Sequence, residues 1–394
     1  MRYHAQADII KTDENILMRE VNIISEINVA GIIAKKRREK GLTQGDLARY
    51  FGVSKASVSK WETGTSYPDI TLLPLLAAYF DMSIDDLIGY EPQMTKEAIS
   101  KLYARLTKDF TVRNGDEVVA ECSAIIKKYY SCYPLLLQMG ILYINHVTCM
   151  SDEEMKKHLL RQAKELFVRV KTESGNIELA KQATVMEAYC LLAEGEADAV
   201  LDLLGDVALE PVMSTEPLLV GAYRMKGQTE KAKSILQVGT YQNIVVLTGL
   251  LINLTMIYLD DSARMEETIR RAQALAEAFD LKHLHQAIFL NLQTSIATAY
   301  ATTGQGEKAL CVLEEITSMM EKDLFPLSLH GDEYFYLIDQ WIADLDLGAQ
   351  TPRDSLLVKK DLIDYVLTAP VFAELTAQEK YRNIARRLAN MRKE

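Results

Sequence analysis

The chain has 394 residues, 48% of them hydrophobic, which is enough for two or three domains or for one small domain followed by a helical array. Its formal net charge of −11 at first argues against a nucleic-acid partner. The acidic excess lies outside residues 28–90, however: this segment has eight lysines and arginines and seven acidic residues, whereas residues 91–394 have a net charge of −10. No signal peptide is visible and no apolar run reaches the roughly 18 residues of a membrane span, so we expect a cytoplasmic protein with no membrane partner.

The cysteines and the catalytic motifs give no indication of covalent or metal chemistry. The five cysteines are odd in number, far apart and without a CxxC pair, so we expect reduced and mostly buried thiols. The sequence contains no P-loop, GxSxG, HExxH or GxGxxG motif. It therefore predicts a protein that is not an enzyme and that uses no cofactor and no metal.

Three parts are expected along the chain. Residues 1–27 are predicted to be an N-terminal extension, and either Met1 or Met18 could begin the chain. Residues 28–90 contain several short segments with helix start and stop signals, which predicts a small helical domain. Residues 91–394 show a helical pattern almost throughout, with sparse glycine and proline.

The first helix of the small domain is predicted over residues 28–40. Val29, Ile32 and Ile33 have the spacing of an amphipathic helix. Lysines and arginines fill its last turn, where positive charge suits the helix dipole, and Gly41 ends it.

Two helices joined by a tight turn follow. Thr43 is a predicted N-cap, with Asp46 three residues later as in a capping box. Gly52 supplies the backbone geometry of the turn, and Ser54 caps the next helix, SKASVSKWE. Two further short helices are expected before residue 90.

The segment GLTQGDLARYFGVSKASVSKWETGTSYPD resembles the Cro/C1 (XRE) type of helix-turn-helix transcription regulators. The matching pairs include Thr43-Gln44, Gly52-Val53 and Trp61-Glu62, and about 60 residues are covered. The resemblance implies a five-helix, lambda-repressor-like domain that binds double-stranded DNA. A five-helix protein-interaction module is the alternative, but it does not explain a polar face on the third helix beside a basic cluster.

In that family the second helix of the motif enters the major groove by its N-terminal end. When the family's base-contacting positions are transferred to this sequence, the candidates for base contact are Lys55, Ala56, Ser59 and Lys60. The helix cap and the candidates for phosphate contact complete the expected DNA-binding set: Ser54, Gln44, Ser57, Arg37 and Arg38.

The C-terminal three hundred residues contain similar segments that begin near Leu191, Tyr223 and Tyr300. Each has a glycine four residues after its first position, followed by small and leucine positions at matching offsets. A less regular copy lies around Tyr258. The segments resemble tetratricopeptide repeats, although none has the consensus tryptophan. An all-α superhelix with a concave ligand-binding face is therefore expected for residues 91–394, which would also hold the dimer contacts.

A Cro-type domain followed by such an array resembles the Rgg/PlcR/PrgX group of peptide-sensing regulators. In that group, asparagines on inner helices bind the backbone of a short peptide, since an amide offers both donor and acceptor. The candidate peptide-binding residues are Asn253, Asn291, Asn243 and Gln293. Each of them could equally be a solvated or capping amide.

Two last helices are expected over residues 355–367 and 377–393, the second of them basic and suited to capping the array or to dimer contact. The sequence as a whole predicts a homodimeric, sequence-specific DNA-binding regulator controlled by a short signalling peptide. Two alternatives stay open. The array could dock a folded protein partner, or the chain could be an adaptor that has lost DNA binding.

Overall fold

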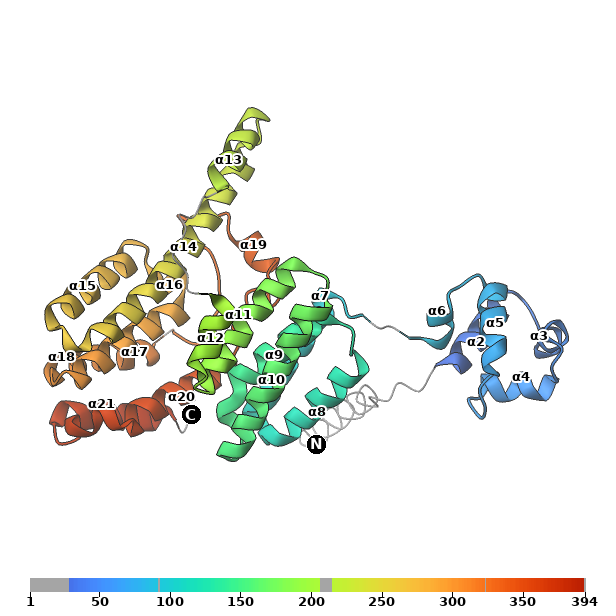
Figure 1. The fold of residues 1–394 in the computed structure, drawn as a ribbon, viewed down its shortest axis with the longest axis horizontal. Helices are drawn as coiled ribbons and strands as arrows, with labels where there is room; N and C mark the ends of the chain where they lie inside the picture. The colour runs from blue at the N-terminus through green and yellow to red at the C-terminus, as the bar shows by residue number, and fades with distance from the viewer. Residues whose placement is uncertain (1–27, 91–92, 206–214, 323, 393–394) are drawn as a thin grey trace, which may run out of the picture.

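The structure is a computed structural model that describes residues 28–90, 93–205, 215–322 and 324–392. Over these ranges it contains helices and no strand, which confirms the all-α prediction (Figure 1). The predicted N-terminal extension lies outside the described residues. Buried hydrophobic side chains fall into three clusters, one in the N-terminal domain and two in the remainder of the described chain.

The N-terminal domain has the five predicted helices and its own core, and Figure 1 shows it as a separate body. The helices are α2 (Val29–Glu39), α3 (Gln44–Phe51), α4 (Lys55–Glu62), α5 (Leu73–Phe80) and α6 (Ile84–Ile88). Thr43 and Asp46 form the expected capping box at the start of α3. Gly52 ends α3 with φ of 67°, a left-handed conformation that favours glycine.

The second cluster is formed by α7 (Lys96–Val112), α8 (Gly115–Lys128), α9 (Tyr133–His146), α10 (Glu153–Glu173) and α11 (Ile177–Ala193). α9 is its centre, because side chains on all sides of this helix are buried. Gly140 of α9 faces the ring of Phe167 on α10, where an added Cβ would lie 2.6 Å from ring atoms. The glycine therefore lets these two helices pack closely. α12 (Ala197–Leu204) follows and has no buried residue.

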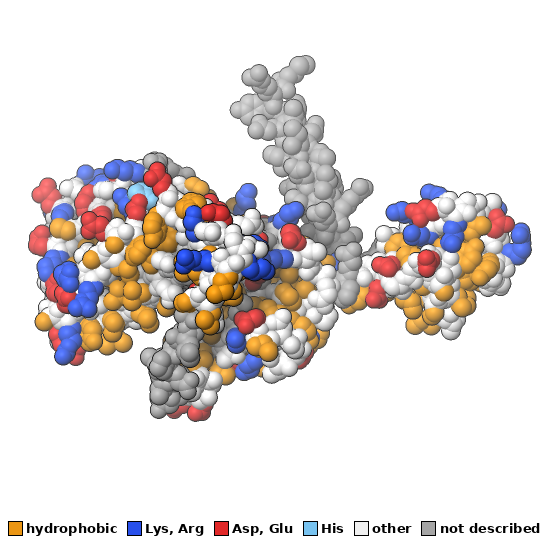
Figure 2. All heavy atoms as spheres, turned by 90° about the horizontal axis from the view of Figure 1, so that it is seen from above, with side chains coloured by type: hydrophobic (Ala, Val, Ile, Leu, Met, Phe, Trp, Pro, Cys, Tyr) orange, Lys and Arg blue, Asp and Glu red, His pale blue; other side chains and the backbone are white. Residues whose placement is uncertain are grey.

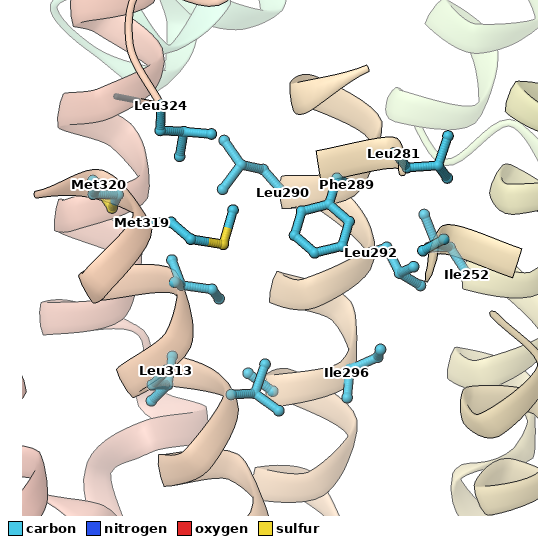
Figure 3. Packing of buried hydrophobic residues seen from close by; sticks show 14 of the residues in the cluster. Ile252, Leu281, Phe289, Leu290, Leu292, Ile296, Leu313, Met319, Met320 and Leu324 are labelled. Atoms are coloured by element: carbon cyan, nitrogen blue, oxygen red, sulfur yellow. The ribbon is translucent and has the colours of Figure 1, made fainter. Parts of the chain in front are cut away.

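The third cluster lies in the C-terminal part of the chain, and Figure 3 shows part of its packing. Its longer helices are α14 (Thr229–Ile257), α15 (Ser262–Ala278), α17 (Gln286–Thr302), α18 (Gly306–Met320), α20 (Ser355–Thr368) and α21 (Glu379–Met391). The short helices nearby are α13 (Glu216–Met225), α16 (Leu281–Leu284) and α19 (Asp339–Ala343). α13 packs against α14, and the two project from the body (Figure 1).

The helix pairs only partly follow the expected repeat. Gly195, Gly227 and Gly304 each lie in a turn between two helices and have positive φ, as the repeated segments predicted. The pairs are not uniform, however. The 29-residue α14 packs against both α13 and α15, and residues 324–338 contain no helix. A regular tetratricopeptide superhelix thus stays a prediction.

The last helix packs within the chain. Tyr381, Ile384 and Leu388 form the predicted apolar stripe of α21, and all three are buried. The guanidinium of Arg387 pairs with Glu314 of α18 and with Glu321, the residue that follows this helix. Because this stripe is covered by the protein's own helices, α21 caps the helical body with its apolar face.

One expectation from the sequence is wrong. No segment was expected to have the length and composition of a membrane span, but residues 229–260 do, with a mean hydropathy of 1.6 in their best 18-residue window. Only 22% of that window is buried. α14 nevertheless contributes one face to the third cluster, as a core helix of a soluble protein also would.

His146 makes the stability of the second cluster depend on pH. Its ring is buried and stacks on Phe110 with centroids 4.4 Å apart, and burial lowers its pKa to about 4 from the ordinary 6.5. Between these values the unfolded chain binds a proton that the folded chain does not, so stability should fall as the pH is lowered. Urea unfolding at pH 7 and pH 5 measures this loss. His146→Phe keeps a ring and removes the titration, so an unchanged pH dependence would contradict the assignment.

Candidate nucleic-acid interface

One face of α4 is free of the protein's own core. Val58 and Trp61 are buried and anchor the helix to the domain. Of the four predicted base contacts, Lys55, Ala56 and Lys60 are exposed and Ser59 is half-buried, and their contact with bases stays a prediction. A helix held by one face, with small and cationic side chains on the other, has the form that a major groove admits.

The serines of α4 are less free than its lysines. The Ser54 hydroxyl accepts a hydrogen bond from the Ser57 backbone N–H at 3.0 Å and lies 2.8 Å from the Ser57 hydroxyl. Ser57 and Ser59 are half-buried. The cap fixes the first turn of α4, and the helix N-terminus there favours an anion such as phosphate.

Glu62, at the end of α4, ties three helices of the domain together. Its carboxylate accepts hydrogen bonds from Arg37 Nε at 2.5 Å and Arg37 Nη2 at 2.9 Å, and from Gln44 Nε2 at 2.9 Å. Arg37 Nη1 also donates to the Leu42 carbonyl at 2.6 Å. Hydrogen bonds from Arg37 lower the pKa of Glu62, and the same contact raises the pKa of Arg37. We call Arg37, Gln44 and Glu62 the interhelix clamp.

The clamp corrects one predicted role. Arg37 was expected to contact phosphate, but its guanidinium is engaged within the domain and its side chain is only 11% exposed. A phosphate contact would require the loss of a buried ion pair, so Arg37 instead positions α4 on α2. Gln44 commits one amide N–H to Glu62 and retains a second for an outside acceptor.

The other cations of α2 differ in their surroundings. Arg38 is exposed, and its charge helps to lower the pKa of Glu62, so it stays a candidate phosphate contact. Lys35 and Lys36 pair with Glu39, and Lys40 lies over the Tyr79 ring. Figure 2 shows lysines and arginines beside acidic residues on this domain, in keeping with its small net charge.

The four predicted peptide-binding residues do not converge on one site. Asn243 and Asn253 lie on α14, and each side-chain amide donates to the carbonyl four residues earlier in its own helix, at 2.8 and 2.9 Å. Gln293 is buried in α17, and its Oε1 has no hydrogen-bond partner among the described residues. Asn291 is exposed and lines a cavity of about 990 Å³.

We call this cavity the α17–α20 cavity. Asn291, Thr294, Ser295 and Thr298 form a polar stripe of α17 along it, at the i, i+3, i+4, i+7 spacing of one helix face. Across the cavity, the Tyr365 hydroxyl of α20 lies 2.9 Å from that of Thr298. Of these four residues only Asn291 was predicted from the sequence, although the spacing of the three hydroxyl residues within an apolar helix was a visible signal.

The arrangement of α3, the turn at Gly52 and α4 is that of a helix-turn-helix domain, as the resemblance implied. Residues 33–87 match the helix-turn-helix family. The HTH-type transcriptional activator BcrR of Enterococcus faecalis is 39% identical to this chain over 59 residues. That similarity covers 15% of this chain and 29% of the relative, so the chain spans less than a third of the protein it matches. Among solved structures, none matches the chain.

Proposed function

We propose that the protein is a sequence-specific, DNA-binding transcription regulator. The observation that carries the proposal is the exposed face of α4, on which Lys55 and Ala56 point away from the core. Lysine can donate to guanine O6 and N7, and a methyl group can contact the methyl of thymine. Arg38 and the second N–H of Gln44 would contact phosphates and fix the register.

Two copies of the chain would bind one DNA site. A single recognition helix contacts few base pairs and therefore distinguishes the operator only weakly from other DNA. When two copies bind two related half-sites about 34 Å apart, their two preferences for the operator sequence multiply. The operator would then have approximate two-fold symmetry, because each half meets the same surface.

A gel shift with the full chain and its own upstream DNA tests the proposal. We expect retarded complexes whose affinity falls steeply between about 50 and 200 mM salt, since phosphate contacts release counterions. Random DNA of equal length is the control for specificity. Equal affinity for both DNAs would overturn sequence-specific regulation, and no salt-dependent binding would favour an adaptor without DNA binding.

We further propose that a short peptide with apolar side chains controls DNA binding from the α17–α20 cavity. The cavity has the size of a small-ligand site, and it combines apolar walls with the hydroxyls and the amide of the α17 stripe. Amide and hydroxyl groups can pair with a peptide backbone, and Leu290, Leu327 and Leu362 offer apolar contact. For the peptide to control DNA binding, it must bind one arrangement of the dimer more tightly than another.

Asn291→Ala should weaken the effect of synthetic apolar peptides on DNA affinity by up to about tenfold, the loss expected for one hydrogen bond. Fluorescence anisotropy with labelled operator DNA at increasing peptide concentration measures this. Asn390→Ala is the matched control, since Asn390 is exposed on α21 and lies outside this cavity. Equal effects of the two substitutions would contradict a ligand site at the cavity.

A further inference from the structure

α14 carries an apolar stripe that faces solvent. Its exposed positions follow one another at steps of four and three residues: Leu236, Thr240, Asn243, Leu247, Leu250, Leu254 and Ile257. These seven positions extend over about 32 Å of the helix. Alternating steps of four and three residues are the spacing of the residues in contact when two helices pair. We call these seven residues the α14 stripe.

The opposite face of α14 already has its partners. Tyr241, Ile244 and Ile252 are buried in the third cluster, and the helix packs against α15 and α17. The stripe is therefore a second contact face on a helix whose first face is in use. It also lacks charge, because no ionisable side chain other than Tyr241 and Tyr258 occurs between Lys233 and Asp260.

Hydrogen bonds hold the projecting part of α14 in its place. Gln237 Nε2 donates to the Tyr334 carbonyl at 2.9 Å, and the Leu337 N–H donates to Gln237 Oε1 at 2.9 Å. The Ser234 hydroxyl donates to the Leu337 carbonyl at 3.2 Å. A movement of α14 toward the exposed apolar residues of α11 would break these three hydrogen bonds, and in the described structure the stripe stays exposed.

We propose that the α14 stripe is the surface through which two copies of this chain associate. Association of two copies of a chain with net charge −11 is opposed by their overall repulsion, and a contact surface without charge adds no like-charge pairs to it. The stripe is such a surface. The proposal deepens the proposed function, because it states how two recognition helices are brought to one operator.

The polar positions and glycine of α14 fit a paired helix. Asn243 occupies a seam position, where a single asparagine restricts register and the number of associated helices. Beside the seam, a Cβ added at Gly249 would have no described atom within 4 Å, so a second helix can approach the backbone there. α13, which packs against α14, also carries the exposed Leu218 and Leu219.

Analytical ultracentrifugation of the full chain tests the proposal. We expect a dimer for the wild type and, for Leu250→Glu, a dissociation constant raised by about 30-fold or more, as for a central interface residue. Leu250 is 58% exposed, so the substitution should leave the fold intact, which circular dichroism verifies. Val185→Glu on α11 is the matched control, since Val185 is 62% exposed and lies outside the stripe.

Three results would overturn the proposal. They are a monomeric wild type at micromolar concentration, a Leu250→Glu dimer as stable as the wild type, and a dimer broken only by Val185→Glu. Co-sedimentation with phosphatidylglycerol vesicles that Leu250→Glu abolishes, with the dimer intact, would assign the stripe to a membrane. Salt-dependent binding of a single half-site by the monomeric variant would show that DNA recognition survives, so the two proposals can fail separately.

Discussion

Glu62→Ala should destabilise the N-terminal domain by about 3–5 kcal/mol, the usual cost of removing one partner from a buried ion pair. The side chains of Glu62 and Arg37 are only 6% and 11% exposed. Without the carboxylate, the Arg37 guanidinium stays in place with only the Leu42 carbonyl as a partner, and Gln44 loses its acceptor. The hydrogen bonds that join α4 to α2 and α3 through Glu62 would be lost, so α4 would be held less firmly in the domain.

Urea unfolding of the full chain, followed by Trp61 fluorescence, measures this loss. Trp61 is buried in the N-terminal core, and Trp341→Phe removes the signal of the other tryptophan. Glu39→Ala is the control, because Glu39 makes exposed pairs with Lys35 and Lys36 that contribute at most about 1 kcal/mol. Similar effects of the two substitutions would mean that the clamp adds little to stability.

The clamp also has a pH dependence of known sign. The pKa of Glu62 is lower in the folded state than its ordinary 4.5. The stabilisation is therefore present above pH 4.5 and is lost as the pH falls through the lowered folded-state value. Glu62→Gln should remove this dependence.

Lys55→Ala should weaken binding to the operator by about 1–3 kcal/mol, which corresponds to a loss of roughly 5- to 150-fold. Lys55 is the first residue of α4 and is exposed, so its ammonium group can reach a base edge in the groove that α4 enters. Removing a base contact should also relax the preference at one base pair, while binding to random DNA changes little.

Fluorescence anisotropy with operator DNA, single-base operator variants and random DNA measures these effects. Lys35→Ala is the matched control, since Lys35 is exposed on α2 and pairs with Glu39. Lys60→Ala provides a comparison within α4. If Lys55→Ala weakens binding to specific and random DNA equally, Lys55 contacts phosphate and reads no base.

The helix-turn-helix domain was predictable from the sequence because its determinants are local. Thr43, Ser54 and Ser83 each cap a helix by accepting a hydrogen bond from the backbone N–H three residues later. Gly52 ends α3 in the left-handed conformation that favours glycine. Val58 and Trp61 show by spacing alone which face of α4 is buried. The helix order of the domain and the exposed face of α4 could therefore be inferred from neighbouring residues.

Side-chain partners that are distant in the sequence were decided only by the tertiary structure. Arg37 lies in a basic cluster of the sequence, but Glu62, 25 residues away, engages its guanidinium and removes it from the DNA surface. Similarly, only the packing of α17 and α20 placed Asn291 at the α17–α20 cavity, whereas Asn243 lines a smaller cavity beside α13 and the Asn253 amide donates to its own helix. Local spacing determined which residues share a helix face. Which of those faces is covered depends on contacts between segments far apart in the chain, and a local sequence pattern does not predict such contacts.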